Sequence, residues 1–175
     1  MSAIVHDAVV DTATLNIAAL RRMSYGELDD LYRAATAPRV ISDVNGHSRG
    51  AMLAWRSPQT GPLAWLLRTF GASTGFPWEG KSFDGDRDRG TGINRVNFFG
   101  KRKWFPFKTR FDASFVDGKP TFVLDYSSDG NPPMIRSIVD EIREVAPGLY
   151  LGPAAIKIKG RPRRVLFFAV SHQGD

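Results

Sequence analysis

The chain contains no cysteine among its 175 residues, which excludes disulfide bonds and any metal or nucleophilic site built on a thiol. It has only three histidines, and their spacing fits neither an HxH nor an HExxH motif. The sequence therefore predicts no metal site. Phosphate-binding glycine loops and the GxSxG motif of hydrolases are also missing, so no cofactor is predicted.

No apolar run approaches the roughly 20 residues that a membrane-spanning helix needs. The first 20 residues have no basic start, and His6, Asp7 and Asp11 interrupt them, so no signal peptide is expected. Together with the absence of cysteine, this predicts a cytoplasmic protein. Residues 1–20 show no firm periodicity and are expected to form a mobile N-terminal arm, followed by one domain over residues 21–175.

The net charge of +6 comes from two short segments. Without ten lysines and arginines within residues 101–110 and 157–164, the rest of the chain would carry −4. Basic patches of this kind attract nucleic acid or other anionic surfaces. They also occur as solvated strand edges, where they discourage edge-to-edge aggregation. Both interpretations stay open.

The clearest pattern in the chain lies in residues 103–126. Phe105, Phe107, Thr109 and Phe111 fall on alternate positions, as in a strand with one buried face. Asp-Gly at positions 117–118 then predicts a tight hairpin, because such turns need a positive φ. Residues 121–126 form the returning strand. The pattern predicts a β-rich fold with an aromatic interior.

About seven strands and three helices are expected in total. The predicted strands cover residues 47–55, 75–83, 93–99, 103–115, 121–126, 149–158 and 164–170. A capping box at Ser24 and Glu27 predicts one helix, residues 63–70 a second, and the stripe Ile135, Ile138, Ile142 a third over residues 132–145. Consecutive, tightly turned strands predict an α+β fold, mainly antiparallel β, with a single barrel or strongly curved sheet that helices plug or flank.

A few polar residues interrupt the apolar strand faces and are candidates for a ligand site. Most ligand pockets combine apolar walls with a few convergent polar groups. The candidate ligand-binding residues are Trp78, Asn94, Phe105, Phe107, Thr109, Phe111 and Tyr150. The alternative is a filled core whose polar groups bond to one another.

Four side chains are candidates for acid–base chemistry: Asp125, Tyr126, Lys81 and Glu141. In the predicted strand register Asp125 faces outward, and only a shift of register would make it a buried general base. On the predicted third helix Glu141 lies near the edge of the apolar stripe. Its neighbour Asp140 faces outward there, so the two carboxylates cannot share one proton.

Several segments resemble a pattern found in uncharacterised bacterial proteins. These segments are residues 76–83 (FPWEGKSF), 92–94, 124–136, 140–143 and 147–152. More loosely, the strand order and the tryptophan beside a glycine resemble the calycin (lipocalin-like) barrels. That resemblance implies binding of small apolar ligands and, in some branches, isomerisation, cyclisation or decarboxylation. The calycin signature is glycine-x-tryptophan, whereas Trp78-Glu79-Gly80 runs in the opposite order here.

The leading functional hypothesis is binding of a small apolar or amphipathic molecule in a barrel pocket, with acid–base chemistry of isomerase, cyclase or lyase type as an extension. The alternative is binding of nucleic acid or an anionic surface through the two basic hairpins. The sequence carries no indication of oligomeric state.

Overall fold

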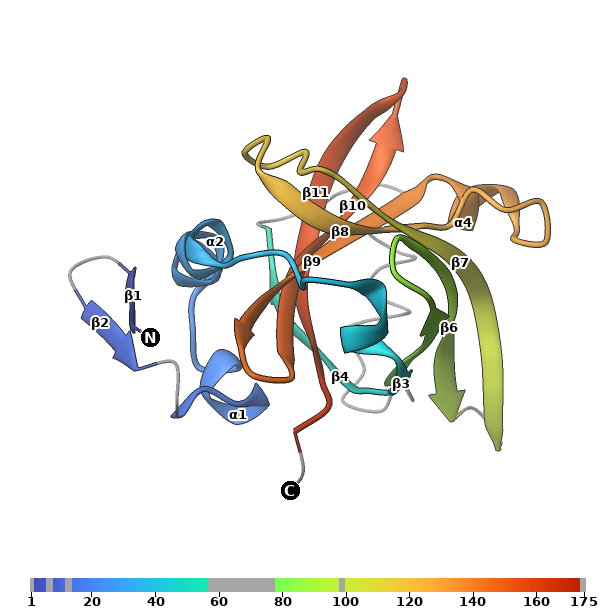
Figure 1. Ribbon diagram of the computed structural model, residues 1–175. Helices are drawn as coiled ribbons and strands as arrows, with labels where there is room; N and C mark the ends of the chain where they lie inside the picture. The colour runs from blue at the N-terminus through green and yellow to red at the C-terminus, as the bar shows by residue number, and fades with distance from the viewer. Residues whose placement is uncertain (1, 6–7, 12–13, 57–77, 98–99, 174–175) are drawn as a thin grey trace.

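The computed structural model describes residues 2–5, 8–11, 14–56, 78–97 and 100–173. Within these residues, nine strands form one antiparallel sheet in the order β3-β5-β6-β7-β8-β9-β10-β11-β4 (Figure 1). Their bounds are β3 Gly46–His47, β4 Arg49–Trp55, β5 Trp78–Gly85, β6 Arg89–Asn97, β7 Lys101–Ala113, β8 Pro120–Asp125, β9 Ile138–Ala146, β10 Leu149–Ile158 and β11 Arg161–Ser171.

The sheet curls until its two ends meet. From β5 to β11 each strand pairs with the next along the chain, while the two end strands β3 and β4 are consecutive pieces of residues 46–55. Between them, the Ser48 N–H donates to the Lys81 carbonyl at 3.0 Å. Gly80, at φ +135°, allows this approach, because a Cβ there would lie 2.1 Å from the Ser48 carbonyl oxygen. The result is a nearly closed barrel.

Two differences account for nine strands where about seven were predicted. The strand predicted over residues 47–55 is divided at Ser48 into β3 and β4, which pair with opposite ends of the sheet. Residues 138–146, predicted as part of a helix, form β9. The helix predicted over residues 63–70 lies outside the described residues.

The predicted helix over residues 132–145 is wrong except for one turn, α4 (Pro133–Arg136). This turn has no side-chain cap, and the side-chain amide of the preceding Asn131 donates to the carbonyls of Pro106 and Tyr126. On the predicted helix Asp140 was expected to face outward and Glu141 to lie near the edge of the apolar stripe, yet Asp140, Glu141 and Arg143 are all buried. A strand that buries polar residues on both faces does not show the alternation by which strands are recognised.

The predicted hairpins are confirmed, but only the β10–β11 turn has the tight primed geometry that was expected. Gly118 in the β7–β8 turn has φ +74°, and its N–H donates to the Ser114 carbonyl at 2.9 Å. In the β10–β11 turn, Lys159 and Gly160 have φ +49° and +76°, as a tight primed turn requires. Local turn chemistry therefore sets the register of the β10–β11 hairpin, whereas a longer turn over residues 114–119 connects β7 to β8.

The barrel interior holds the main core. Alternate residues of β8 and β11 face inward and pack with aromatic side chains of β5 and β7. The short helix η2 (Ile41–Val44) adds Ile41 and Val44 to this core. The inward residues include Phe83, Phe107, Phe122, Leu124, Tyr126, Phe168 and Val170.

A second core lies outside the barrel wall, under α2 (Tyr25–Ala34). The capping box predicted at Ser24 and Glu27 opens this helix. Its buried side chains Leu28, Leu31 and Tyr32 pack on the outward residues of β10 and β11. Because β11 is covered on both faces, its continuous apolar run is explained.

Residues 1–20, expected as a mobile arm, contain regular structure. β1 (Ser2–Val5) and β2 (Ala8–Asp11) form a two-stranded antiparallel hairpin, and α1 (Ile17–Leu20) follows. Leu15 and Leu20 are buried in the second core. None of the helices in the described ranges is long and apolar enough to span a bilayer.

Candidate functional site

Four polar side chains converge inside the barrel from four neighbouring segments of the sheet. They are Lys81 of β5, Asn94 of β6, Tyr126 directly after β8 and Asp140 of β9, and none exposes more than 8% of its surface. The register brings them together, since Lys81 pairs with Asn94 across β5–β6, and Leu124 pairs with Asp140 across β8–β9. We call these four side chains the polar cluster.

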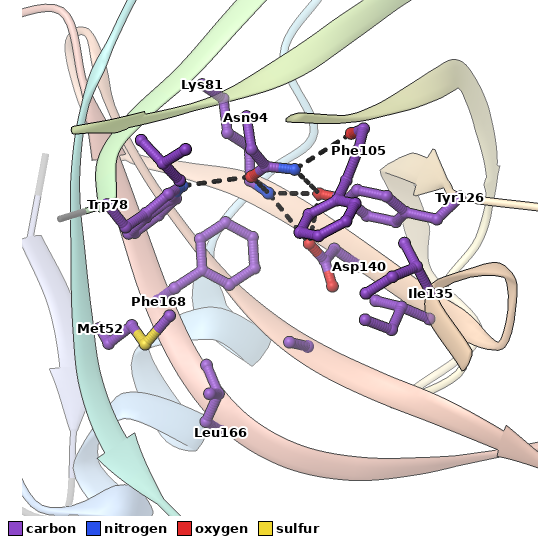
Figure 2. A pocket seen from close by; sticks show the side chains of 13 residues that line it. Met52, Trp78, Lys81, Asn94, Phe105, Tyr126, Ile135, Asp140, Leu166 and Phe168 are labelled. Carbon is purple, nitrogen blue, oxygen red and sulfur yellow. Dashed lines mark hydrogen bonds and ion pairs between the residues drawn. The ribbon is translucent and has the colours of Figure 1, made fainter. Parts of the chain in front are cut away.

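Hydrogen bonds join the whole cluster (Figure 2). The Lys81 Nζ donates to Asn94 Oδ1 at 3.0 Å, to Tyr126 Oη at 2.5 Å and to Asp140 Oδ2 at 3.2 Å. The Tyr126 hydroxyl donates to the same Oδ2 at 3.2 Å. Asn94 Nδ2 donates to Tyr126 Oη and to the Phe105 carbonyl, both at 3.2 Å, while its Oδ1 also accepts from Trp78 Nε1 at 3.1 Å.

This network uses every polar group except one. All three protons of a Lys81 ammonium and both amide protons of Asn94 have acceptors, and the Tyr126 oxygen accepts two bonds and donates one. Asp140 Oδ1 is buried and has no partner among the described residues. One acceptor of the polar cluster is therefore left over.

Aromatic rings surround the Lys81 amine. Its Nζ lies 5.0–5.4 Å from the ring centroids of four residues, which are Trp78, Phe107, Tyr126 and Phe168. Distances within about 6 Å allow favourable cation–π contacts. These rings stabilise a buried cation without adding a second negative charge.

Burial shifts the pKa values of the cluster. It lowers the pKa of Lys81 and raises that of Asp140, and the attraction between the two groups opposes both shifts. Burial, together with the Asp140 carboxylate, raises the pKa of Tyr126 well above its usual value. The Lys81–Asp140 pair has no net charge whether the proton lies on the amine or on the carboxylate.

The cluster forms one wall of an apolar cavity of about 130 Å³, which we call the aromatic pocket (Figure 2). Its volume is close to that of a cavity that holds a benzene ring. Half-buried Met52, Trp78 and Phe105 line it beside the buried residues. The full lining is Met52, Trp78, Lys81, Asn94, Val96, Phe105, Tyr126, Ile135, Ile138, Asp140, Ala154, Leu166 and Phe168.

Five residues predicted for the site lie in the aromatic pocket, namely Trp78, Lys81, Asn94, Phe105 and Tyr126. Phe107 is 1% exposed and packs behind the pocket wall, with its ring centroid 5.1 Å from that of Tyr126. Tyr150 is also buried, but its hydroxyl donates to the Asp43 carbonyl at 3.1 Å and does not line the pocket.

Three other predicted residues, Thr109, Phe111 and Asp125, line a different hollow of about 530 Å³ together with Arg89, Lys108 and Arg110. We call it the basic cavity. It is larger, but its charged groups are exposed or already paired. Asp125 lies on the outer side of β8 within 3.1 Å of Arg110 and 3.8 Å of Lys157.

The environment of Asp125 does not make it a general base. Burial raises the pKa of Asp125. Hydrogen bonds from Ser127 and the nearby cations Lys157 and Arg110 together lower this pKa by more than burial raises it, so the net shift is downward. The outward orientation expected from the strand pattern holds.

Glu141, another predicted candidate, is fully buried but lies on the face of β9 opposite Asp140. Its Oε1 accepts from the hydroxyls of Tyr32 at 2.8 Å and Ser114 at 2.5 Å, and its Oε2 accepts from the Phe115 N–H at 3.2 Å. It joins α2 to the barrel wall and does not reach the pocket. The expected position at the edge of a helix is wrong because this segment is a strand.

Asp140 is the site residue that sequence reasoning missed. Interpreted as a strand, residues 138–142 place Ile138, Asp140 and Ile142 on one face, and that face points into the barrel. The abundance of β-branched residues in this segment was the available signal. No group of three or more metal-ligating side chains gathers anywhere in the described ranges.

Comparison with known proteins adds evidence on the fold. No family model matches the chain, and no curated protein matches it in sequence. Among solved structures, the crystal structure of a protein from Thermomonospora curvata is similar, with a TM-score of 0.56 and 20% sequence identity. The match covers 90% of this chain and 93% of that protein. At this identity the likeness shows the nearly closed barrel-like fold and nothing about activity.

Proposed function

We propose that this protein binds a small apolar or amphipathic molecule in the aromatic pocket. The observation that carries the proposal is the convergence of Lys81, Asn94, Tyr126 and Asp140 on a cavity with otherwise apolar walls. Apolar walls with a few convergent polar groups are typical of small-molecule sites. A buried ion pair is weak evidence for a purely structural role, because apolar residues of similar volume often stabilise a core as well or better.

The strand order supports a calycin-like architecture for this function. Seven consecutive strands form an up-and-down meander, and residues 46–55 complete the barrel as one divided strand. Lipocalins likewise hold one small ligand in an up-and-down barrel of eight strands. The cavity of about 130 Å³ is smaller than most drug-sized sites, so it fits one ring or a short branched chain.

Native mass spectrometry of the protein purified from its own host tests this proposal. We expect a small molecule of defined mass to accompany the wild-type protein. Ala154 lines the pocket, so Ala154→Phe should fill it and remove that mass. Ile158 lies on the same strand and is 51% exposed, so the matched control Ile158→Phe should retain it. If Ala154→Phe folds and still carries the same molecule, binding does not occur in the aromatic pocket.

Acid–base chemistry on the bound molecule is a second candidate function. It is favoured by three titratable groups, Lys81, Tyr126 and Asp140, that bond to one another within 3.2 Å beside an apolar cavity. The test is incubation of the co-purified molecule with the protein in D₂O. Deuterium incorporation or isomerisation that is lost in Lys81→Met would support catalysis, and an unchanged molecule would leave binding alone.

Binding of nucleic acid through the basic hairpins stays a prediction. Arg102, Lys103, Lys108 and Arg110 of β7 are exposed, as are Arg161 and Arg163 of β11. Trp104, the aromatic residue among them, is half-buried. Stacking on a single half-buried ring gives little affinity for bases. Salt-dependent retention on heparin that is lost on neutralising Arg102 and Lys103 would favour this function.

A further inference from the structure

We propose that the molecule in the aromatic pocket is uncharged and donates a hydrogen bond, from a hydroxyl or a ring N–H, to Asp140 Oδ1. This inference rests on the proposed binding function and names the chemical class of the ligand. Its basis is the distribution of unused hydrogen-bonding capacity around the cavity.

The donors of the cluster are already occupied. Each N–H and O–H of Lys81, Asn94 and Tyr126 has an acceptor within 3.2 Å, and the indole N–H of Trp78 bonds to Asn94. A ligand that offers only acceptors, such as an ether or a ketone, finds no free donor there. It would have to break an existing bond, which costs free energy in an apolar site.

The unused group is an acceptor. Asp140 lines the pocket, its Oδ2 accepts from Lys81 and Tyr126, and its Oδ1 has no partner among the described residues. Figure 2 shows one carboxylate oxygen joined to the cluster and the other free of any drawn bond. A buried carboxylate oxygen without a partner is costly, so a ligand that donates to it gains the energy of a charge-assisted bond.

The charge balance of the site selects a neutral ligand. Lys81 and Asp140 are the ionisable pair of the cluster, they lie 3.2 Å apart, and together they carry no net charge. An anion would face Asp140, and a cation would lie beside Lys81, in each case within an apolar cavity that stabilises unpaired charge poorly. A neutral ring or branched chain with one hydroxyl or N–H satisfies both the charge balance and the free acceptor.

The substitution Asp140→Asn tests the polarity of this contact. The Asn oxygen should take the Oδ2 position, where Lys81 and Tyr126 donate, and this places the amide N–H₂ where Oδ1 was. The free acceptor then becomes a free donor. The two probes are phenol, whose hydroxyl donates, and benzonitrile, whose nitrile nitrogen only accepts, and both are neutral rings of similar size.

Dissociation constants for both probes are measured by ligand-observed NMR titration on wild-type protein and on Asp140→Asn. We expect the ratio of phenol affinity to benzonitrile affinity to fall at least about tenfold in the variant, because a bond to a charged group is exchanged for the opposite polarity. Comparing this ratio between the two proteins cancels the difference in hydrophobicity between the probes. An unchanged ratio would overturn the proposal.

Charged probes and a second variant complete the test. Benzoate and benzylammonium should bind wild-type protein at least about tenfold more weakly than phenol, and tighter binding of either would overturn the neutral class. If Asp140→Asn does not fold, the double variant Lys81→Met/Asp140→Leu replaces it. There the phenol-to-toluene affinity ratio should fall at least about tenfold, and a constant ratio would contradict the proposal.

These outcomes distinguish failure of the proposed binding function from failure of the proposed ligand class. If neither the neutral rings nor the charged probes bind at millimolar concentration, the proposed binding function fails. If neutral rings bind but Asp140→Asn leaves their order unchanged, the pocket is a binding site and the donor class is wrong.

Discussion

Two adjacent carboxylates on β9 have opposite surroundings, although both are buried. Glu141 faces the outer wall, where three donors, one from α2 and two from the β7–β8 turn, occupy both of its oxygens. Asp140 faces the interior and lines a cavity; one of its oxygens is bonded, and the other has no partner in the part of the chain that the structure describes. The first arrangement is complete and joins elements of the fold. The second is incomplete in a way that a ligand can complete.

A buried arginine on the same outer face of β9 also has all of its hydrogen-bonding groups occupied. Arg143, two residues after Glu141 on the same face, is 0% exposed, and all five of its N–H groups are bonded. Two of these bonds go to the Asp117 carboxylate at 2.7 and 2.8 Å, and the rest go to backbone carbonyls. The outer face of β9 thus holds both α2 and the β7–β8 turn.

The largest effect on stability is expected for Arg143→Met. The change leaves the Asp117 carboxylate and three carbonyls without their donor, so the free energy of unfolding should fall by about 3–5 kcal/mol. Urea titration followed by circular dichroism measures it. The control Arg110→Met, in an exposed pair, should cost less than about 1 kcal/mol. Equal losses would show that the outer face is not specially stabilised.

The next largest effect is a pH dependence of the free energy of unfolding that arises from the Asp117 carboxylate. The hydrogen bonds from Arg143 are the main reason that its pKa is lowered from 3.8 to about 2. A carboxylate with a lowered pKa in the folded state stabilises the fold above its unfolded pKa and loses that contribution as the pH falls through the folded value. Asp117→Asn should therefore be less stable than wild type by about 2 kcal/mol at pH 6.

This difference in unfolding free energy should shrink between pH 4 and pH 2. Parallel urea titrations of the two proteins at several pH values measure it. A gap that stays constant over this range would mean that the Asp117 carboxylate does not contribute through its charge.

A smaller loss is expected for Tyr32→Phe, which removes the hydroxyl that donates to Glu141. Loss of one bond to a buried carboxylate should lower the unfolding free energy by about 1.5 kcal/mol. Tyr25 is the matched control, because it also lies on α2 and packs on Phe167, but its buried hydroxyl has no partner within the described part of the chain. Tyr25→Phe should be neutral or slightly stabilising. Thermal unfolding of both variants separates these outcomes.

The smallest stability change is expected on the Asp140 side, provided that both charges are removed together. The double variant Lys81→Met/Asp140→Leu should stay within about 1 kcal/mol of wild type, since apolar replacement of a buried ion pair is often neutral. Asp140→Leu alone leaves Lys81 unpaired and should cost more. A double variant as unstable as Arg143→Met would make the polar cluster structural and remove the contrast between the two faces.

Features fixed by short stretches of sequence were predicted from the sequence. The turn around Gly160 and the Ser24–Glu27 capping box form as expected, because each depends on the conformational preferences of a few neighbouring residues. Asp117 and Gly118 lie in the turn between β7 and β8 as predicted, but that turn spans residues 114–119 and is not tight. The polar residues Asn94 and Tyr126 were found as exceptions on strands whose apolar pattern was otherwise clear, and Lys81 was found as a polar residue of the glycine-flanked segment 75–83.

Features that depend on long-range packing were not predicted from the sequence. The Ile135, Ile138, Ile142 spacing fits a helix, but residues 138–146 pair with β8 and β10, and this pairing outweighs the local preference. As a consequence Asp140 was placed on a solvated face, and Glu141 was a catalytic candidate. Secondary structure decides whether Asp140 or Glu141 faces the interior. Because this segment was predicted as a helix and not as a strand, the wrong one of the two was chosen as a site residue.

The closure of the barrel by residues 46–55 has a consequence for how the pocket arises during synthesis. Met52 on β4 and Phe168 on β11 are directly paired, and both line the cavity, yet they lie in the first and last thirds of the chain. Pairings between such distant segments form slowly, because a long loop must close first. A ribosome must therefore release nearly the whole polypeptide before any ligand can be enclosed, and nascent chains truncated before β11 should be unable to hold one.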